Sequence, residues 1–146
     1  MIQNKLEELA KTCITGKWIT VPVVPLGKPR MTRADVWKGR ECVQSYWRFK
    51  DELRLRLGRS TVPLPHQIKG VSWFAYFPLP ESYSKKKCAE LSGQPFPLHQ
   101  VKPDRDNIDK AILDSLFGND SAVAIGLTGK FWDDGEGTRI EILFIV

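Results

Sequence analysis

Hydrophobic residues recur at the spacing of an α-helix in four parts of the chain. The predicted helices cover residues 2–16, 43–57, 82–91 and 105–117. In the second of these, the apolar stripe that should face a core consists of Val43, Tyr46, Trp47, Leu53 and Leu57. The fourth is bounded on both sides, because a Pro-Asp pair precedes it and Gly118 follows it.

Alternating or continuous apolar residues predict the strands. Residues 18–24 are rich in β-branched and aromatic side chains but contain Pro22, which has no ladder donor, so we expect an edge strand there. Residues 71–77 are apolar on both faces and should form a central strand. Alternation returns in residues 123–128 and 140–144, on either side of an Asp-Asp-Gly turn. The chain is therefore expected to end in a β-hairpin.

Together these elements predict one α+β domain, residues 1–146, with a mixed β-sheet and helices packed mainly on one face. The length suits a single domain, and no repeat or linker divides the chain. No apolar run approaches the roughly 18 residues of a membrane helix, and the first ten residues lack the apolar region of a signal peptide. We expect a cytoplasmic protein with no membrane partner.

Cysteine and histidine offer no recognisable metal or disulfide motif. The three cysteines, at positions 13, 42 and 88, lie far apart without a C-x-x-C pair, so they are interpreted as reduced core thiols. His66 and His99 have no Cys or His nearby and are expected at the surface or in turns, without a functional role.

Charge is unevenly distributed along the chain. The net charge is +5, but residues 101–120 hold five aspartates and three basic residues, a net charge of −2. Residues 26–60 hold ten basic and four acidic residues, a net charge of +6. Two interpretations of this basic body with one acidic pocket are open. The charge keeps the protein soluble, or the basic surface binds a polyanion over a metal site.

The acidic residues gather at the start of the helix predicted at 105–117. One of them suffices as a cap, so capping alone is one interpretation of the cluster. At about 100° per residue, however, the polar residues share one arc of the helix and the apolar ones lie opposite. The polar arc consists of Asp106, Asn107, Lys110 and Asp114, and the apolar side of Ile108, Ala111, Ile112 and Leu116.

Asp120 follows Gly118 by two residues, so the chain can fold it back towards Asp104 and Asp106. Carboxylates crowded together resist ionisation unless a divalent cation neutralises them. Mg²⁺ is the expected cation, because it binds through one or two carboxylates, waters and substrate phosphate. Lys110 would then lie beside the scissile phosphate.

The run from Lys102 to Lys110 reads Lys-Pro-Asp-Arg-Asp-Asn-Ile-Asp-Lys and is followed by Asn119-Asp120-Ser121 and Lys130-Phe131-Trp132. With the upstream segments 27–32 and 82–87, this pattern resembles the RusA family of Holliday junction resolvases, in particular its phage-type members. The resemblance extends over most of the chain from about residue 19. One departure is Asn119, where family members often carry a second acidic residue.

The resemblance implies a homodimeric, Mg²⁺-dependent endonuclease, with Mn²⁺ as a substitute, that makes paired nicks in four-way DNA junctions during recombination and repair. It also implies that the protein acts in the cell of a bacterial host and belongs to a phage, a prophage or the host. The implied catalytic residues are Asp104, Asp106, Lys110 and Asp120, and the three aspartates are the implied metal ligands. Asn107 and Asp114 are expected to support them.

Basic residues outside the acidic cluster are candidates for contact with DNA phosphates. They are Lys28, Arg30, Lys85, Lys86, Lys87 and Lys130. A solvated face explains the lysine run equally well. Two other functions stay open: cleavage of flaps or other branched DNA by the same chemistry, and a non-catalytic nucleic-acid-binding module whose acidic cluster is only a cap.

Overall fold

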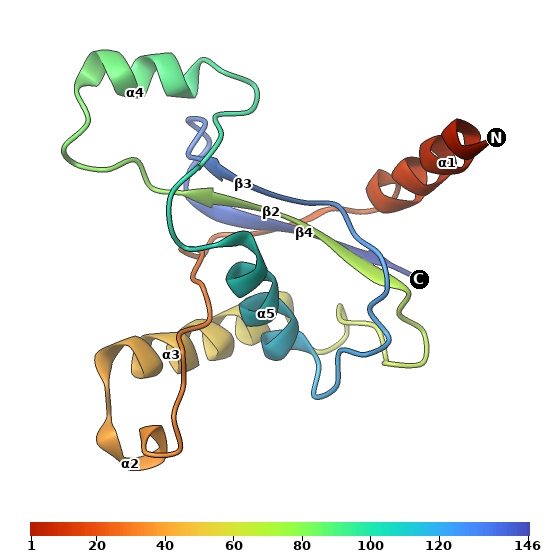
Figure 1. The fold of residues 1–146 in the computed structure, drawn as a ribbon, viewed down its shortest axis with the longest axis horizontal. Helices are drawn as coiled ribbons and strands as arrows, with labels where there is room; N and C mark the ends of the chain where they lie inside the picture. The colour runs from red at the N-terminus through yellow and green to blue at the C-terminus, as the bar shows by residue number, and fades with distance from the viewer.

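The computed structural model describes all of residues 1–146 and has five helices and four strands. In chain order these are α1 (Ile2–Ile14), β1 (Ile19–Val21), α2 (Asp35–Lys38), α3 (Glu41–Leu57), β2 (Gly70–Phe77), α4 (Lys85–Ser92), α5 (Arg105–Leu116), β3 (Thr128–Trp132) and β4 (Arg139–Ile145). The strands form one mixed sheet in the order β1-β4-β2-β3 (Figure 1). The predicted α+β class is confirmed.

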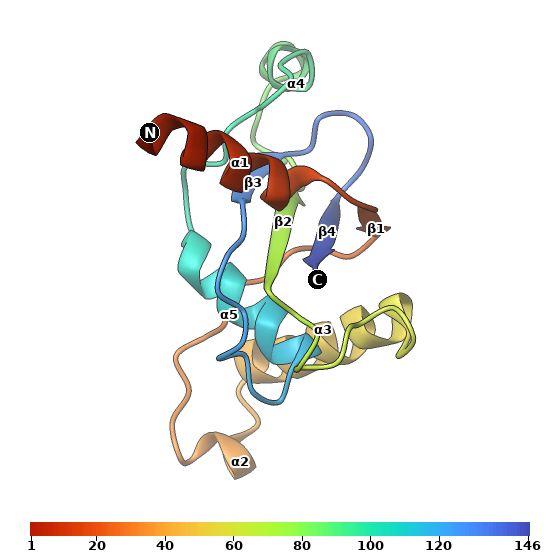
Figure 2. The ribbon, with the colours of Figure 1, turned by 90° about the vertical axis from the view of Figure 1, so that its right-hand side faces the viewer.

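The main core lies between one face of the sheet and the pair α3 and α5 (Figures 1 and 2). The face of β2 that carries Val71, Trp73 and Ala75 is buried in it, together with the apolar stripe of α5. Only α1 crosses the other face, where Ser72 Oγ donates to the carbonyl of Cys13 at 2.6 Å. Helices packed mainly on one face were therefore correctly predicted.

The predicted terminal hairpin is wrong. β2 lies between β3 and β4, pairing in parallel with β3 (Phe77 with Trp132) and antiparallel with β4 (Tyr76 with Arg139). Because β3 returns through α5 to lie parallel to β2, the Asp-Asp-Gly turn crosses the end of β2, and the Asp133 amide donates to the Phe77 carbonyl at 2.7 Å. The alternation identified strands but not which strands pair.

Three local features also differ from the sequence-based expectations. Trp47, predicted on the core-facing stripe of residues 43–57, is 40% exposed, and of the predicted core thiols only Cys13 is buried, because Cys42 is exposed and Cys88 is half-buried. His99 is only 4% exposed and stacks on Phe77 with ring centroids 4.1 Å apart. It is buried because the loop after α4 pairs with β3, where the His99 amide donates to the Lys130 carbonyl at 3.2 Å. None of the helices is both long and apolar enough to span a membrane.

Candidate active site

The candidate site is the amino-terminal end of α5. Asp104 is the residue before the helix, and its carbonyl accepts the amides of Asn107 and Ile108, but its carboxylate forms no capping hydrogen bond. The interpretation of this aspartate as a cap therefore fails, because its side chain does no capping. The carboxylate is left available to bind a cation or water.

Two residues of the predicted polar arc, Asp106 and Lys110, lie on the surface, whereas Asn107 and Asp114 are half-buried. Asp106 and Lys110 are mostly exposed, and Lys110 Nζ lies 3.7 Å from Asp106 Oδ2. Ile108 and Ala111, on the opposite side, are fully buried. The buried side anchors α5 against the sheet, so the carboxylate and the ammonium are presented to solvent one turn apart on a fixed support.

A second polar group supports α5 from the side. Lys28 Nζ forms an ion pair with Asp114 Oδ2 at 2.7 Å, and the Tyr46 hydroxyl donates to the same oxygen at 2.8 Å. Burial raises the pKa of Asp114, but the hydrogen bonds from Lys28 and Tyr46 outweigh burial and hold that pKa below its ordinary value. Burial, together with the hydrogen bond to Asp114, raises the pKa of Tyr46. Asp114 is therefore an ionised structural partner.

The segment before α3 is tied to the same helix through its backbone. The Lys28 amide donates to the Asn107 carbonyl at 2.9 Å. A Cβ atom at Gly27 would lie 2.6 Å from Cβ of Pro103, so this close approach requires glycine. Gly27, Lys28, Lys102, Pro103, Asp104 and Asn107 line one cavity at this contact.

Lys130 supports the turn that leads into Asp104. Its ammonium donates to the carbonyl of Val101 and, at 2.8 Å, to that of Pro103. Burial lowers the pKa of Lys130 below its ordinary value, and the nearby Asp104 carboxylate offsets only part of this decrease. The ammonium is thus engaged within the chain, which gives it a positioning role. Its contact with DNA stays a prediction.

The other predicted DNA contacts are at the surface. Arg30 is exposed, and the three lysines occupy the first turn of α4, a helix that has no buried residue and projects from the body (Figure 1). The ammonium of Lys87 lies over the ring of Tyr83, 3.8 Å from its centroid. These cations are accessible to a large polyanion.

Asp120 is not brought next to Asp104 and Asp106 within the chain. These two residues stand at the start of α5, whereas Asp120 follows its last residue by four positions, and a 12-residue helix is about 18 Å long. No group of three or more His, Cys, Asp or Glu side chains is arranged to hold a metal ion. The role of Asp120 stays a prediction.

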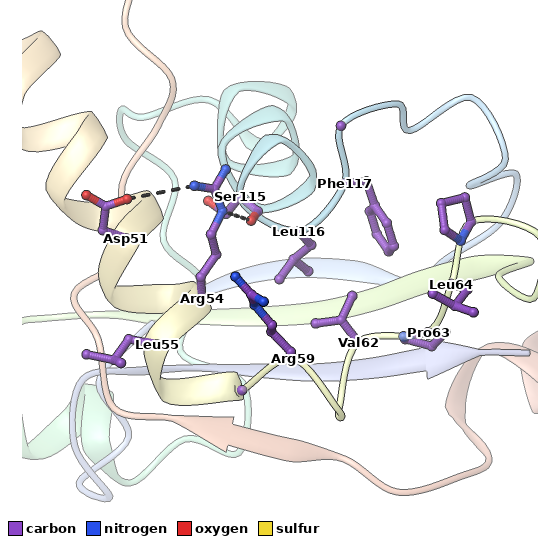
Figure 3. Close-up of a pocket in the computed structure, with 13 residues that line it drawn as sticks. Asp51, Arg54, Leu55, Arg59, Val62, Pro63, Leu64, Ser115, Leu116 and Phe117 are labelled. Carbon is purple, nitrogen blue, oxygen red and sulfur yellow. Dashed lines mark hydrogen bonds and ion pairs between the residues drawn. The ribbon is translucent and has the colours of Figure 1, made fainter.

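A large cavity lies at that far end of α5, away from the acidic cluster (Figure 3). Leu116, Phe117, Val62 and Arg59 line it, and Arg54 donates to the Ser115 carbonyl at 2.5 Å. Its one carboxylate, Asp51, already faces Arg54 at 3.7 Å. This lining offers no ligand set for a hard cation.

A family model described as endodeoxyribonuclease RusA matches residues 21–143. The chain belongs to the RusA family. Comparisons with curated proteins and with solved structures gave no match. At the level of the RusA family, the chain is a nuclease of a group that acts on branched DNA junctions. The matched range includes every residue of the acidic cluster at α5.

The acidic cluster of this RusA-family chain suits a hard cation in a two-carboxylate form. Mg²⁺ binds through one or two carboxylates and completes its shell with waters and substrate phosphate. Asp104 and Asp106 provide oxygen ligands within one turn, and the carboxylate of Asp104 is not used for capping. The chemistry of these two donors therefore suits Mg²⁺, and the binding of the ion stays a prediction.

Two supporting residues escaped the sequence analysis. Tyr46 was predicted only as a core residue, and its hydroxyl orients Asp114. Trp73 was predicted only as part of a buried strand, and its indole Nε1 donates to Asp109 Oδ1 at 2.8 Å. A polar tip on a buried aromatic ring is the only signal that could have pointed to them, since such tips usually find a partner.

Proposed function

We propose that this chain is a Mg²⁺-dependent, structure-selective endodeoxyribonuclease that resolves four-way DNA junctions by paired nicks. The observation that carries the proposal is the pair of carboxylates at the start of α5, one of them free of capping, with Lys110 one turn further on. Family membership supports the substrate class. The same family membership favours an endonuclease over a non-catalytic nucleic-acid-binding module.

Asp104 and Asp106 would hold the Mg²⁺ ion. When bound, the ion supplies positive charge to the scissile phosphate and an activated water. Lys110 is exposed on the same face, so its ammonium can stabilise the negative charge that develops on the phosphate. Lys28 and Lys130 fix the segments on either side of Asp104, which keeps the reacting groups in position.

Paired nicking requires two equivalent sites related by two-fold symmetry, and each chain offers one such carboxylate pair. We therefore propose a homodimer as the active form. Asp120, which the family resemblance assigns to the metal, is included in the proposal as a residue to be tested and carries none of its weight.

The test is cleavage of end-labelled DNA of three shapes: a four-way junction, a flap and a plain duplex, each with and without Mg²⁺. Wild-type protein should nick opposite strands of the junction only with Mg²⁺. Asp106→Asn should lose this cleavage, and Asp51→Asn is its matched control, because Asp51 is an exposed carboxylate outside the site. Preferred single cleavage of the flap would replace junction resolution with flap endonuclease activity. An absence of Mg²⁺-dependent cleavage on all three substrates would refute the proposal.

A further inference from the structure

The segment between β1 and α3 forms a projection that carries an exposed tryptophan. Residues 30–40 extend away from the sheet, with α2 at their outer end (Figures 1 and 2). Trp37 is 75% exposed and Val36 is 82% exposed. Among the five tryptophans, Trp37 has the most accessible ring. Nothing within the chain packs over this tip.

The projection is nevertheless built around an ion pair whose carboxylate is buried. Asp35 is 2% exposed, and it accepts hydrogen bonds from Arg40 Nε at 2.6 Å and from the Thr32 amide at 2.5 Å. Arg40 Nη2 reaches the second carboxylate oxygen of Asp35 at 2.7 Å and also the carbonyl of Arg30 at 2.9 Å. The guanidinium therefore joins the two arms of the projection. Gly39, with φ of 62°, allows the chain to turn back between them.

The base of the projection is joined to the candidate active site. The Lys28 amide binds the Asn107 carbonyl, and the Lys28 ammonium binds Asp114, both on α5. Because both ends of the segment are fixed, the backbone that carries Trp37 is held in place relative to α5. A preorganised segment loses less conformational entropy when it binds a ligand.

The charge around the tip favours a polyanion. Arg30, Arg33 and Lys38 are exposed and form no ion pair, and the only acidic residue of the projection, Asp35, is already neutralised by Arg40. A self-contact of this surface across a two-fold axis would bring two such sets of cations together, which is unfavourable. Nucleic acid offers both phosphates for the cations and a flat base for the indole.

Resting on the proposed function, we infer that Trp37 stacks on a base that is exposed at the branch point, while Arg30, Arg33 and Lys38 contact the flanking phosphates. The bases of a continuous duplex are already stacked on both faces, so the indole finds a partner only where stacking is interrupted. The projection thus helps to select branched DNA over duplex DNA. It takes no part in the chemical step.

The experiment measures binding without Mg²⁺, so that no strand is cut. The probes are a four-way junction with 2-aminopurine at the branch point and a duplex of the same sequence. Trp37→Ala should weaken junction binding at least fivefold and change duplex binding less than twofold, in line with the loss of one stacked base. Stacking of the indole on the probe should change the 2-aminopurine fluorescence when wild-type protein binds. Trp37→Ala should abolish this change. Trp37→Phe, which keeps an aromatic ring, should bind the junction within about twofold of wild type.

Trp47→Ala is the matched control, because Trp47 is a partly exposed indole on α3 outside the projection, and it should bind like wild type. Unchanged junction binding by Trp37→Ala, in a protein whose wild type cuts junctions, would refute the inference and leave the proposed function intact. Conversion of a dimer to a monomer by Trp37→Ala in sedimentation would make the tip a self-interface and also refute it. Failure of the wild type to bind branched DNA would overturn both.

Discussion

The buried imidazole of His99 makes the stability of the protein depend on pH. The ring lies between Phe77 and Trp132, with centroids 4.1 and 4.3 Å away, and its Nδ1 has no hydrogen-bond partner. Burial, assisted by the nearby Lys130 charge, lowers the pKa of His99 from 6.5 to about 4. Between these values the unfolded chain binds a proton that the folded protein does not, so stability falls as pH falls.

The size of the effect follows from the two pKa values. With a pKa of 6.5 in the unfolded chain and about 4 in the folded protein, the free energy of unfolding should decrease by about 2 kcal/mol between pH 7 and pH 5. The carboxylates Asp114 and Asp134 also have lowered pKa values, but their contribution is lost only as pH falls below about 4. The pH 5–7 window therefore isolates the histidine.

Urea unfolding, followed by circular dichroism at several pH values in this window, measures the decrease. His99→Phe is the informative variant, because phenylalanine preserves the aromatic stack and cannot be protonated. It should be less sensitive to pH by about the same 2 kcal/mol. An equal pH dependence in the variant and the wild type would refute the assignment of this effect to His99.

Three further substitutions test the support of the site and its chemistry. Tyr46→Phe removes the hydrogen bond to the half-buried Asp114 and should lower the free energy of unfolding by about 1 kcal/mol, or Tm by about 3 °C, in thermal melts. Gly70→Ala would bring a Cβ atom into the carbonyl oxygen of Ile125, so it should cost about 3 kcal/mol in urea unfolding, and a neutral result would contradict the close strand approach. Lys110→Ala should reduce the cleavage rate more than junction affinity, because one exposed cation adds little to binding across a basic surface. Equal losses would instead make this lysine a DNA-docking residue.

Features determined by neighbouring residues were predicted from the sequence. The helix α5 was found because the Pro-Asp pair before it, its apolar periodicity and the following Gly118 are all local signals. The central position of β2 was found because both faces of residues 71–77 are apolar. The polar arc of α5 followed from the same periodicity, so the placement of Asp106 and Lys110 on one exposed face was also predicted.

Features that depend on distant parts of the chain were not predicted. Two alternating segments around a tight turn are typical of a hairpin, and only the parallel return of β3 through α5 shows that β2 separates them. The burial of His99 depends on the pairing of its loop with β3, which no local pattern encodes. The separation of Asp120 from Asp104 likewise follows from the path of the chain after α5.

We propose that the carboxylates at the start of α5 support Mg²⁺-dependent cleavage of DNA, and comparing cleavage and binding by Asp106→Asn tests this role most directly. A labelled four-way junction is used for a nicking assay with Mg²⁺ and for a gel shift without it. Asp106→Asn should lose cleavage while binding the junction as tightly as wild type or more tightly, because one negative charge facing the phosphates is removed. Nicking at a rate near that of the wild type would refute the catalytic role of Asp106.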